Sequence, residues 1–159
     1  MILVLLGTQN NSFYRLLDEI EECIKNKIIT EEVIVQAGHT AYSSNNMKIL
    51  DFISSSELDI LLAKSSYVIT HGGVGSIISS INKNKKVIAV PRLSKYNEHV
   101  NDHQIQIVGN FNKNGYIVGI DDVTSLPTAI NKINTFIPKE YKSNTNQIID
   151  IIDNFIKNN

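Results

Sequence analysis

The stretch Tyr67-Val68-Ile69-Thr70-His71-Gly72-Gly73-Val74-Gly75-Ser76 joins a short apolar run to a glycine-rich turn, and an apolar segment follows it. The continuous apolar run at residues 67–70 is typical of a strand that is buried on both faces. Residues 77–81 are expected to begin a helix. A strand, a tight turn and a helix form the repeating unit of a parallel α/β sheet.

The same alternation extends in both directions from this stretch. Further strands are expected at residues 2–6, 33–35, 47–53, 86–90 and 116–118, and further helices at residues 13–24, 57–64, 98–110, 123–134 and 144–157. Helical crossovers between strands imply right-handed connections and a mainly parallel sheet. The predicted fold class is therefore α/β, a doubly wound, Rossmann-like sheet with helices on both faces.

Length and composition limit the class of protein. The chain has 159 residues, of which 42% are hydrophobic, and we expect a single domain over residues 1–159. A net charge of −1 argues against a nucleic-acid partner. The single cysteine, Cys23, excludes a disulfide framework and a cysteine-built metal site. No apolar run suits a membrane span or a signal peptide, so we expect a cytoplasmic protein.

In open α/β sheets, ligands bind beyond the carboxyl ends of the strands, so the residues that follow each strand are informative. Gly7 and Thr8 follow the first expected strand and precede a helix whose free N–H groups could face an anion. The dinucleotide fingerprint Gly-x-Gly-x-x-Gly is absent there. An ordinary strand-to-helix turn explains this segment equally simply.

The glycine turn after residues 67–70 is the second candidate. Gly72, Gly73 and Gly75 leave backbone N–H groups uncovered beside a helix N-terminus, an arrangement that holds phosphate groups. Ser76 is expected to cap this helix or to donate to a phosphate oxygen. For His71, a catalytic role and a loop histidine that is hydrogen-bonded to backbone both remain open.

The third candidate follows residues 86–90 and combines acids, histidines and amides. It contains Arg92, Asn97, Glu98, His99, Asn101, Asp102, His103 and Gln104. Such a mixture of donors and acceptors suits a hydroxyl-rich ligand. The acids could instead face a helix dipole. The i, i+4 pairs Glu98/Asp102 and His99/His103 would share a helix face if the helix begins this early, but no evident second shell favours a metal there.

The glycine turn and Val90–Gln104 together resemble the carboxyl-terminal, donor-binding domain of glycosyltransferase family 28. The resemblance covers nearly the whole chain. The stretch Val-Pro-Arg-x-x-x-Tyr-x-Glu-His-x-x-Asp-His-Gln is similar to one in the small catalytic subunits of two-part capsule and exopolysaccharide β-1,4-galactosyltransferases. The donor-binding subunit of the dolichol-linked UDP-GlcNAc transferase is also similar. The resemblance implies the carboxyl-terminal half of a GT-B fold and inverting transfer from a UDP-sugar.

The resemblance also implies roles for individual residues. Gly72, Gly73, Gly75 and Ser76 would hold the diphosphate, with Gly7 and Thr8 on its other side. Phe52 and Ile53 match a stretch that packs near the uracil. Arg92 belongs to the matching Pro-Arg motif, and Glu98, Asp102, His103 and Gln104 would meet ribose or sugar hydroxyls. The chain departs from the family pattern at Ser79, where relatives often carry a ribose-binding Glu, and at Gln9, where relatives can have His.

Transfer of a sugar needs a base for the acceptor hydroxyl and stabilisation of the departing UDP. The resemblance implies no cofactor and no required metal, and His71 and His99 are the candidate bases. A GT-B enzyme needs two domains facing a cleft, and this chain has the length of one. We therefore expect a membrane-anchored partner subunit that binds a lipid-linked saccharide acceptor. Through this partner the protein would lie at the inner face of the membrane.

The helix at residues 144–157 carries a broad apolar stripe and is similar to one that contributes to docking on such a partner. Packing on its own sheet is an equally simple explanation. The donor sugar is expected to be a hexose, galactose in the first instance, with N-acetylglucosamine as the alternative. Two further alternatives are a non-catalytic nucleotide-sugar-binding or enhancer subunit and an α/β interaction module without a ligand.

Overall fold

The computed structural model describes residues 1–142, so the predicted helix at residues 144–157 lies outside the described residues. A single sheet of six parallel strands runs in the order β3-β2-β1-β4-β5-β6. The strands are β1 (Ile2–Leu5), β2 (Val33–Gln36), β3 (Met47–Leu50), β4 (Tyr67–His71), β5 (Val87–Val90) and β6 (Val118–Gly119). The predicted fold class is confirmed. The strand order reverses between β1 and β4, where open α/β sheets bind ligands.

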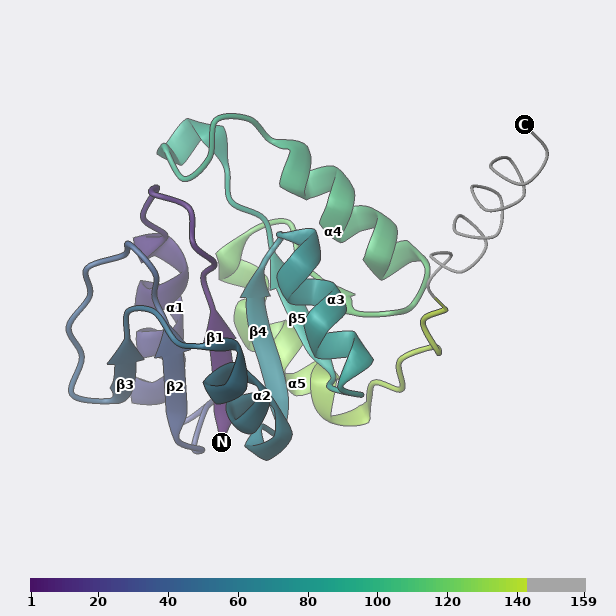
Figure 1. Ribbon diagram of the computed structural model, residues 1–159, viewed down its shortest axis with the longest axis horizontal. Coiled ribbons are helices and arrows are strands. Elements are labelled where there is room, and N and C mark those ends of the chain that lie inside the picture. Colours follow the sequence, from purple (N-terminus) through teal and green to yellow (C-terminus); the bar gives the residue numbers. More distant parts are fainter. Residues whose placement is uncertain (143–159) are drawn as a thin grey trace, which may run out of the picture.

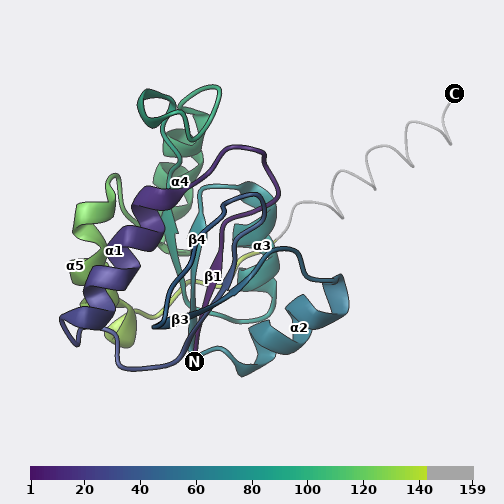
Figure 2. The same ribbon diagram turned by 90° about the vertical axis from the view of Figure 1, so that its left-hand side faces the viewer.

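Five α-helices of the described chain cover the two faces of this sheet (Figures 1 and 2). They are α1 (Tyr14–Lys25), α2 (Ser55–Lys64), α3 (Val74–Asn82), α4 (His103–Lys113) and α5 (Leu126–Thr135). Figure 2 shows α1 and α5 on one side and α2 and α3 on the other. Short 3-10 turns lie at Ser94–Tyr96 and Val123–Ser125.

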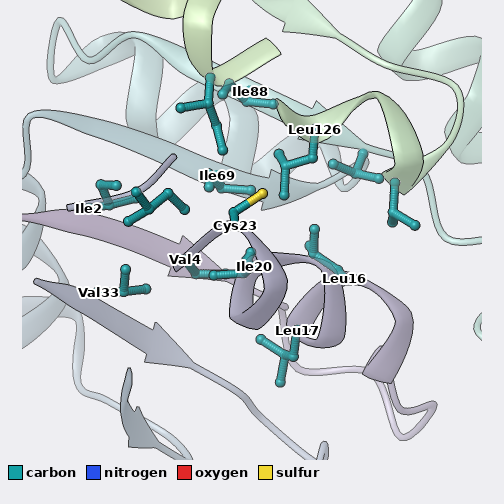
Figure 3. Packing of buried hydrophobic residues seen from close by; sticks show 14 of the residues in the cluster. Ile2, Val4, Leu16, Leu17, Ile20, Cys23, Val33, Ile69, Ile88 and Leu126 are labelled. Carbon is teal, nitrogen blue, oxygen red and sulfur yellow. The ribbon is translucent and has the colours of Figure 1, made fainter. Parts of the chain in front are cut away.

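The core follows the two-residue period of the strands. In β1, Ile2 and Val4 face the layer of α1 and α5, whereas Leu3 and Leu5 face α2. Figure 3 shows Leu16, Ile20 and Cys23 of α1 packed toward this sheet face, close to Ile69 of β4. Both faces of the strand are buried, which explains the continuous apolar runs of the sequence.

Two helices begin at places that the sequence did not predict. The helix expected from residue 98 begins at His103, because residues 97–102 form a loop in which Asn97 has a positive φ of 56°. The i, i+4 pairs of acids and histidines therefore do not share a helix face. The prediction that Ser76 caps α3 is also wrong, since α3 begins at Val74 with Gly73 as its N-cap residue.

Candidate functional site

A cavity of about 590 Å³ lies at the carboxyl edge of the sheet, across the point where the strand order reverses. This volume is in the usual range for small-molecule sites. Eleven of the residues predicted for the site line it, namely Gly7, Thr8, Phe52, Ile53, His71, Gly73, Gly75, Ser76, His99, His103 and Gln104. The structure thus brings together residues from the ends of β1, β3, β4 and β5.

Four predicted site residues are not part of the cavity lining. Gly72 lies beneath α4, where an added Cβ would lie 2.8 Å from Gln104 Cβ and 2.9 Å from Val108 Cγ2. Arg92 is 1% exposed and Glu98 is 3% exposed, and both are hydrogen-bonded inside the protein. Asp102 accepts the Ser94 backbone N–H at 2.7 Å, and this bond lowers the pKa of its carboxyl group.

The ring of His71 is enclosed by two of the glycines. A Cβ at Gly73 would lie 2.1 Å from His71 Nε2, and one at Gly7 would lie 2.6 Å from His71 Cε1. Gly7 also has a φ of +79°, which favours glycine. These two glycines therefore make room for the imidazole at the floor of the cavity, in addition to any role toward a ligand.

Gly75 differs from its neighbours in the glycine turn. It lies in the first turn of α3 and lines the cavity, and apart from its chain neighbours and the backbone of its own helix, no protein atom lies within 4 Å of where its Cβ would be. Glycine destabilises a helix by up to about 1 kcal/mol relative to alanine. Nothing in the packing of the described residues requires a glycine there, and the space next to the α3 N-terminus is open toward the cavity.

Hydrogen bonds assign different roles to the two candidate histidines. His71 Nδ1 lies 3.2 Å from the Leu5 carbonyl oxygen, which can only accept, so the proton is on Nδ1 and Nε2 has a free lone pair. Burial lowers the pKa of His71 to about 4, and the positive charge of Arg92 acts in the same direction. His71 is therefore neutral near pH 7 and can accept a proton at Nε2.

His99 has the opposite arrangement. Its Nδ1 accepts the Asn101 backbone N–H at 3.2 Å, which leaves the proton of the neutral ring on Nε2. That Nε2 lies 3.1 Å from the side-chain amide of Gln9, whose oxygen can accept the proton when the amide is turned toward the ring. His99 thus presents an N–H group to its surroundings, whereas His71 presents a lone pair.

Arg92 connects the segments on both sides of the cavity. Its guanidinium donates to the carbonyl oxygens of Leu6 at 2.7 Å, Asn11 at 2.6 Å and Glu98 at 3.2 Å. Burial lowers the pKa of Arg92 to about 10, and the Glu98 carboxylate opposes this shift. Arg92 therefore holds the loops around the cavity in place through these hydrogen bonds. Its buried position does not match the sequence-based expectation of direct ligand contact.

Several lining residues were missed by the sequence analysis. They are Leu5, Gln36, Leu58 and Ile107. Gln36 accepts the Gly7 N–H at 3.3 Å and donates to the Gly7 and Asp51 carbonyl oxygens. It holds the turn after β1 in place. Its only signal in the sequence is a polar residue at the end of the Val-Ile-Val run.

The cavity lining carries no carboxylate, ammonium or guanidinium group within the described residues. Within residues 1–142, no Asp, Glu, Lys or Arg lines it, and His71, His99 and His103 are its titratable side chains. The described residues also contain no cluster of His, Cys, Asp or Glu arranged to hold a metal ion. An anion in this cavity would be held by backbone N–H groups, hydroxyls, amides and histidines.

No helix in the described part of the chain is both long enough and apolar enough to cross a membrane.

Fold and site together define an α/β domain with a cavity at the switch point of a Rossmann-like sheet. The model of the glycosyltransferase family 28 C-terminal domain matches residues 1–158, and the chain belongs to this family. The fold is that of the carboxyl-terminal half of a GT-B glycosyltransferase. No curated protein is a significant match to the sequence.

Two solved glycosyltransferases share the fold. The glycotransferase of kitacinnamycin has a TM-score of 0.58 and 15% identity, and the match covers 84% of this chain and 34% of that one. The glycosyltransferase SnogD from Streptomyces nogalater has a TM-score of 0.54 and 16% identity, covering 84% and 38%. The chain therefore spans little more than a third of the length of these structures.

Proposed function

We propose that this chain is the donor-binding subunit of an inverting glycosyltransferase that uses a UDP-sugar. The observation that carries the proposal is the free space at Gly75, in a cavity at the α3 N-terminus and at the switch point of a family 28 domain. Uncovered N–H groups at a helix N-terminus stabilise a diphosphate, and they also stabilise the charge that builds on UDP as it leaves.

The nucleoside would lie toward β3. Phe52 lines the cavity there, is 55% exposed, and contacts the His39 ring edge-on with 5.0 Å between centroids. An exposed aromatic ring in the lining of the cavity suits stacking on a base. Ser79 lines the cavity at the position where relatives often carry a ribose-binding Glu, and its hydroxyl donates to the Ser76 carbonyl oxygen at 3.1 Å. We therefore propose that neutral groups of this chain bind the ribose.

The sugar would meet His103, Gln104 and Asn101 at the α4 side of the cavity. Gln104 Oε1 accepts the Arg92 backbone N–H at 3.0 Å, which fixes the amide and leaves its NH₂ group free to donate to a hydroxyl. No Lys or Arg lines the cavity within residues 1–142, which favours a neutral hexose over an acidic sugar. We propose galactose, with N-acetylglucosamine as the alternative.

For the base we propose His71 over His99, because only His71 has a free lone pair on Nε2. A pKa of about 4 makes His71 a weak base in the empty cavity. A neighbouring diphosphate raises the pKa of a histidine, since an anion favours the charged ring. Donor binding would therefore increase the basicity of His71 at the moment when it is needed.

The acceptor is proposed to bind outside this domain. The solved structures of the same fold are more than twice as long as this chain, and their match to it covers only 34% and 38% of them. We propose a membrane-anchored partner subunit that binds a lipid-linked saccharide in capsule or exopolysaccharide synthesis. The chain would then act as a peripheral protein at the inner face of the membrane.

Calorimetric titration with UDP tests the donor site. Binding by the chain, alone or with its partner, is the expected result, and no detectable binding in either state would contradict the proposal. Transfer of labelled sugar by the co-expressed pair then tests catalysis. Loss of transfer in His71→Ala, with UDP binding and the complex intact, is expected for the base. Full transfer by this variant would contradict His71 as the base.

A further inference from the structure

Glu98 is a buried carboxylate whose oxygens are all used inside the protein. Its side chain accepts a bidentate pair of bonds from Arg15, at 2.9 Å from Nε and 2.8 Å from the second terminal nitrogen. The Leu93 backbone N–H donates to the same carboxylate at 3.0 Å. With 3% exposure and no place in the cavity lining, Glu98 is not arranged as a ligand contact.

Arg15 links this carboxylate to α1 and to two further segments. Its guanidinium also donates to the Pro91 carbonyl oxygen and to Asp122 Oδ2, both at 3.3 Å. Its charged group lies 4.6 Å from the centre of the Tyr96 ring. Arg15 of α1 therefore contacts the β5–α4 connection at three places, namely at Pro91, where the connection begins, at Tyr96 in the 3-10 turn, and at Glu98.

A buried ion pair is a weak explanation for stability, because desolvation of the two charges offsets most of their attraction. The pair is better explained by the loop that it orders. Residues 97–102 belong to no helix or strand, and Asn97 has a left-handed conformation with a φ of 56°. His99 and Asn101, which line the cavity, follow Glu98 directly.

We propose that the Arg15–Glu98 pair positions the loop at residues 97–102 so that His99 and Asn101 face the cavity. Glu98 is then a positioning residue in place of the sugar contact that the family resemblance implies. The importance of this arrangement for donor binding rests on the proposed function. The positioning of the loop by this pair does not depend on the proposed function.

The first test is Glu98→Gln, which keeps the shape of the side chain but removes its charge and one acceptor oxygen. We expect UDP to bind about tenfold more weakly or worse, since the bonds between a charged carboxylate and Arg15 are stronger than those of a neutral amide, and their loss frees the loop. We also expect faster hydrogen exchange of the amides of residues 93–102 in the ligand-free protein. Both are measured on protein that circular dichroism shows to be folded.

The double variant Arg15→Met with Glu98→Met separates positioning from stability. Replacing a buried ion pair by apolar side chains is often neutral or stabilising. If the pair positions the loop, the double variant still binds UDP weakly when circular dichroism shows it to be folded, even though no charge is left buried without a partner at these two positions. Recovery of wild-type UDP affinity in the double variant would overturn the proposal.

Asp122→Asn is the matched control, because it removes the other carboxylate partner of Arg15, which lies outside the loop. We expect its UDP affinity to stay within about twofold of wild type, as for a part-exposed pair. Wild-type affinity together with wild-type exchange in Glu98→Gln would also overturn the proposal. If the wild-type protein itself does not bind UDP, the proposed function fails, and the exchange measurement still decides the positioning role.

Discussion

The surface of the cavity and the layer directly behind it differ in charge. Among the described residues, the lining carries backbone groups, hydroxyls, amides and three histidines, but no Asp, Glu, Lys or Arg. The layer behind it contains Arg15, Arg92, Glu98 and Asp122, joined by hydrogen bonds and ion pairs. Fixed charges here order the loops, whereas neutral groups and histidines form the surface that the proposed donor would contact.

Removal of a charge from this layer behind the cavity should have the largest effect on stability. Arg92→Met leaves three buried carbonyl oxygens, of Leu6, Asn11 and Glu98, without their donor. We expect the free energy of unfolding to fall by roughly 3–5 kcal/mol, measured by urea denaturation.

An exposed ion pair supplies the control for Arg92→Met. Lys83→Met removes the pair with Asp59, whose side chains are about half exposed, and should change stability by about 0.5 kcal/mol or less. If the free energy of unfolding of Arg92→Met fell by less than about 1 kcal/mol, this would contradict a structural role for the charge.

The titration of His71 gives the next largest effect. Its folded-state pKa of about 4 lies below the ordinary value of 6.5, so between these values the unfolded chain binds more protons. The resulting stability is complete above pH 6.5 and is lost as the pH falls toward 4. We expect a loss of roughly 3 kcal/mol over this range, measured by urea denaturation at each pH.

His71→Asn separates this group from the other titrating residues. The variant keeps a side-chain donor for the Leu5 carbonyl oxygen but does not titrate, so the pH dependence should be shallower by the same amount. Identical pH profiles for the wild type and the variant would show that His71 is not buried in its neutral form.

The smallest of these effects concerns the lining at Phe52. Because this ring is exposed, Phe52→Ala should leave the melting temperature unchanged. UDP should bind about tenfold more weakly, because stacking of a base on an aromatic ring contributes about 1–3 kcal/mol. Inorganic pyrophosphate, which has no base, should bind both proteins equally. If Phe52→Ala weakened the binding of UDP and of pyrophosphate equally, the uracil would not stack on Phe52.

The neutral lining was largely predictable from the sequence, because its residues follow the strands directly. The glycine turn lies between an apolar run and a helix, and a parallel sheet brings such turns to one edge. Gly73, Gly75 and Ser76 could therefore be assigned to the cavity without knowing the strand order. Gln36 was missed because one amide at a strand end has no distinctive pattern.

The layer behind the cavity was not predictable, because its partners are far apart in the chain. Arg15 and Glu98 are separated by 83 positions, and the sequence alone gives Glu98 the same character as the neighbouring amides and histidines. The same pair explains why α4 begins at His103 and not at residue 98. The loop conformation is imposed by tertiary contacts that override the local pattern.

The glycine next to the α3 N-terminus offers the most direct test of the account. Gly75→Ala and Gly109→Ala each place a methyl group in a helix where no protein atom outside that helix's own backbone and the chain neighbours lies within 4 Å, but only Gly75 of the two lines the cavity. Both variants should be as stable as the wild type or slightly more so. Calorimetric titration should show that UDP binds Gly109→Ala normally and Gly75→Ala at least about tenfold more weakly. Equal UDP affinity of the two variants would contradict a diphosphate site at this helix.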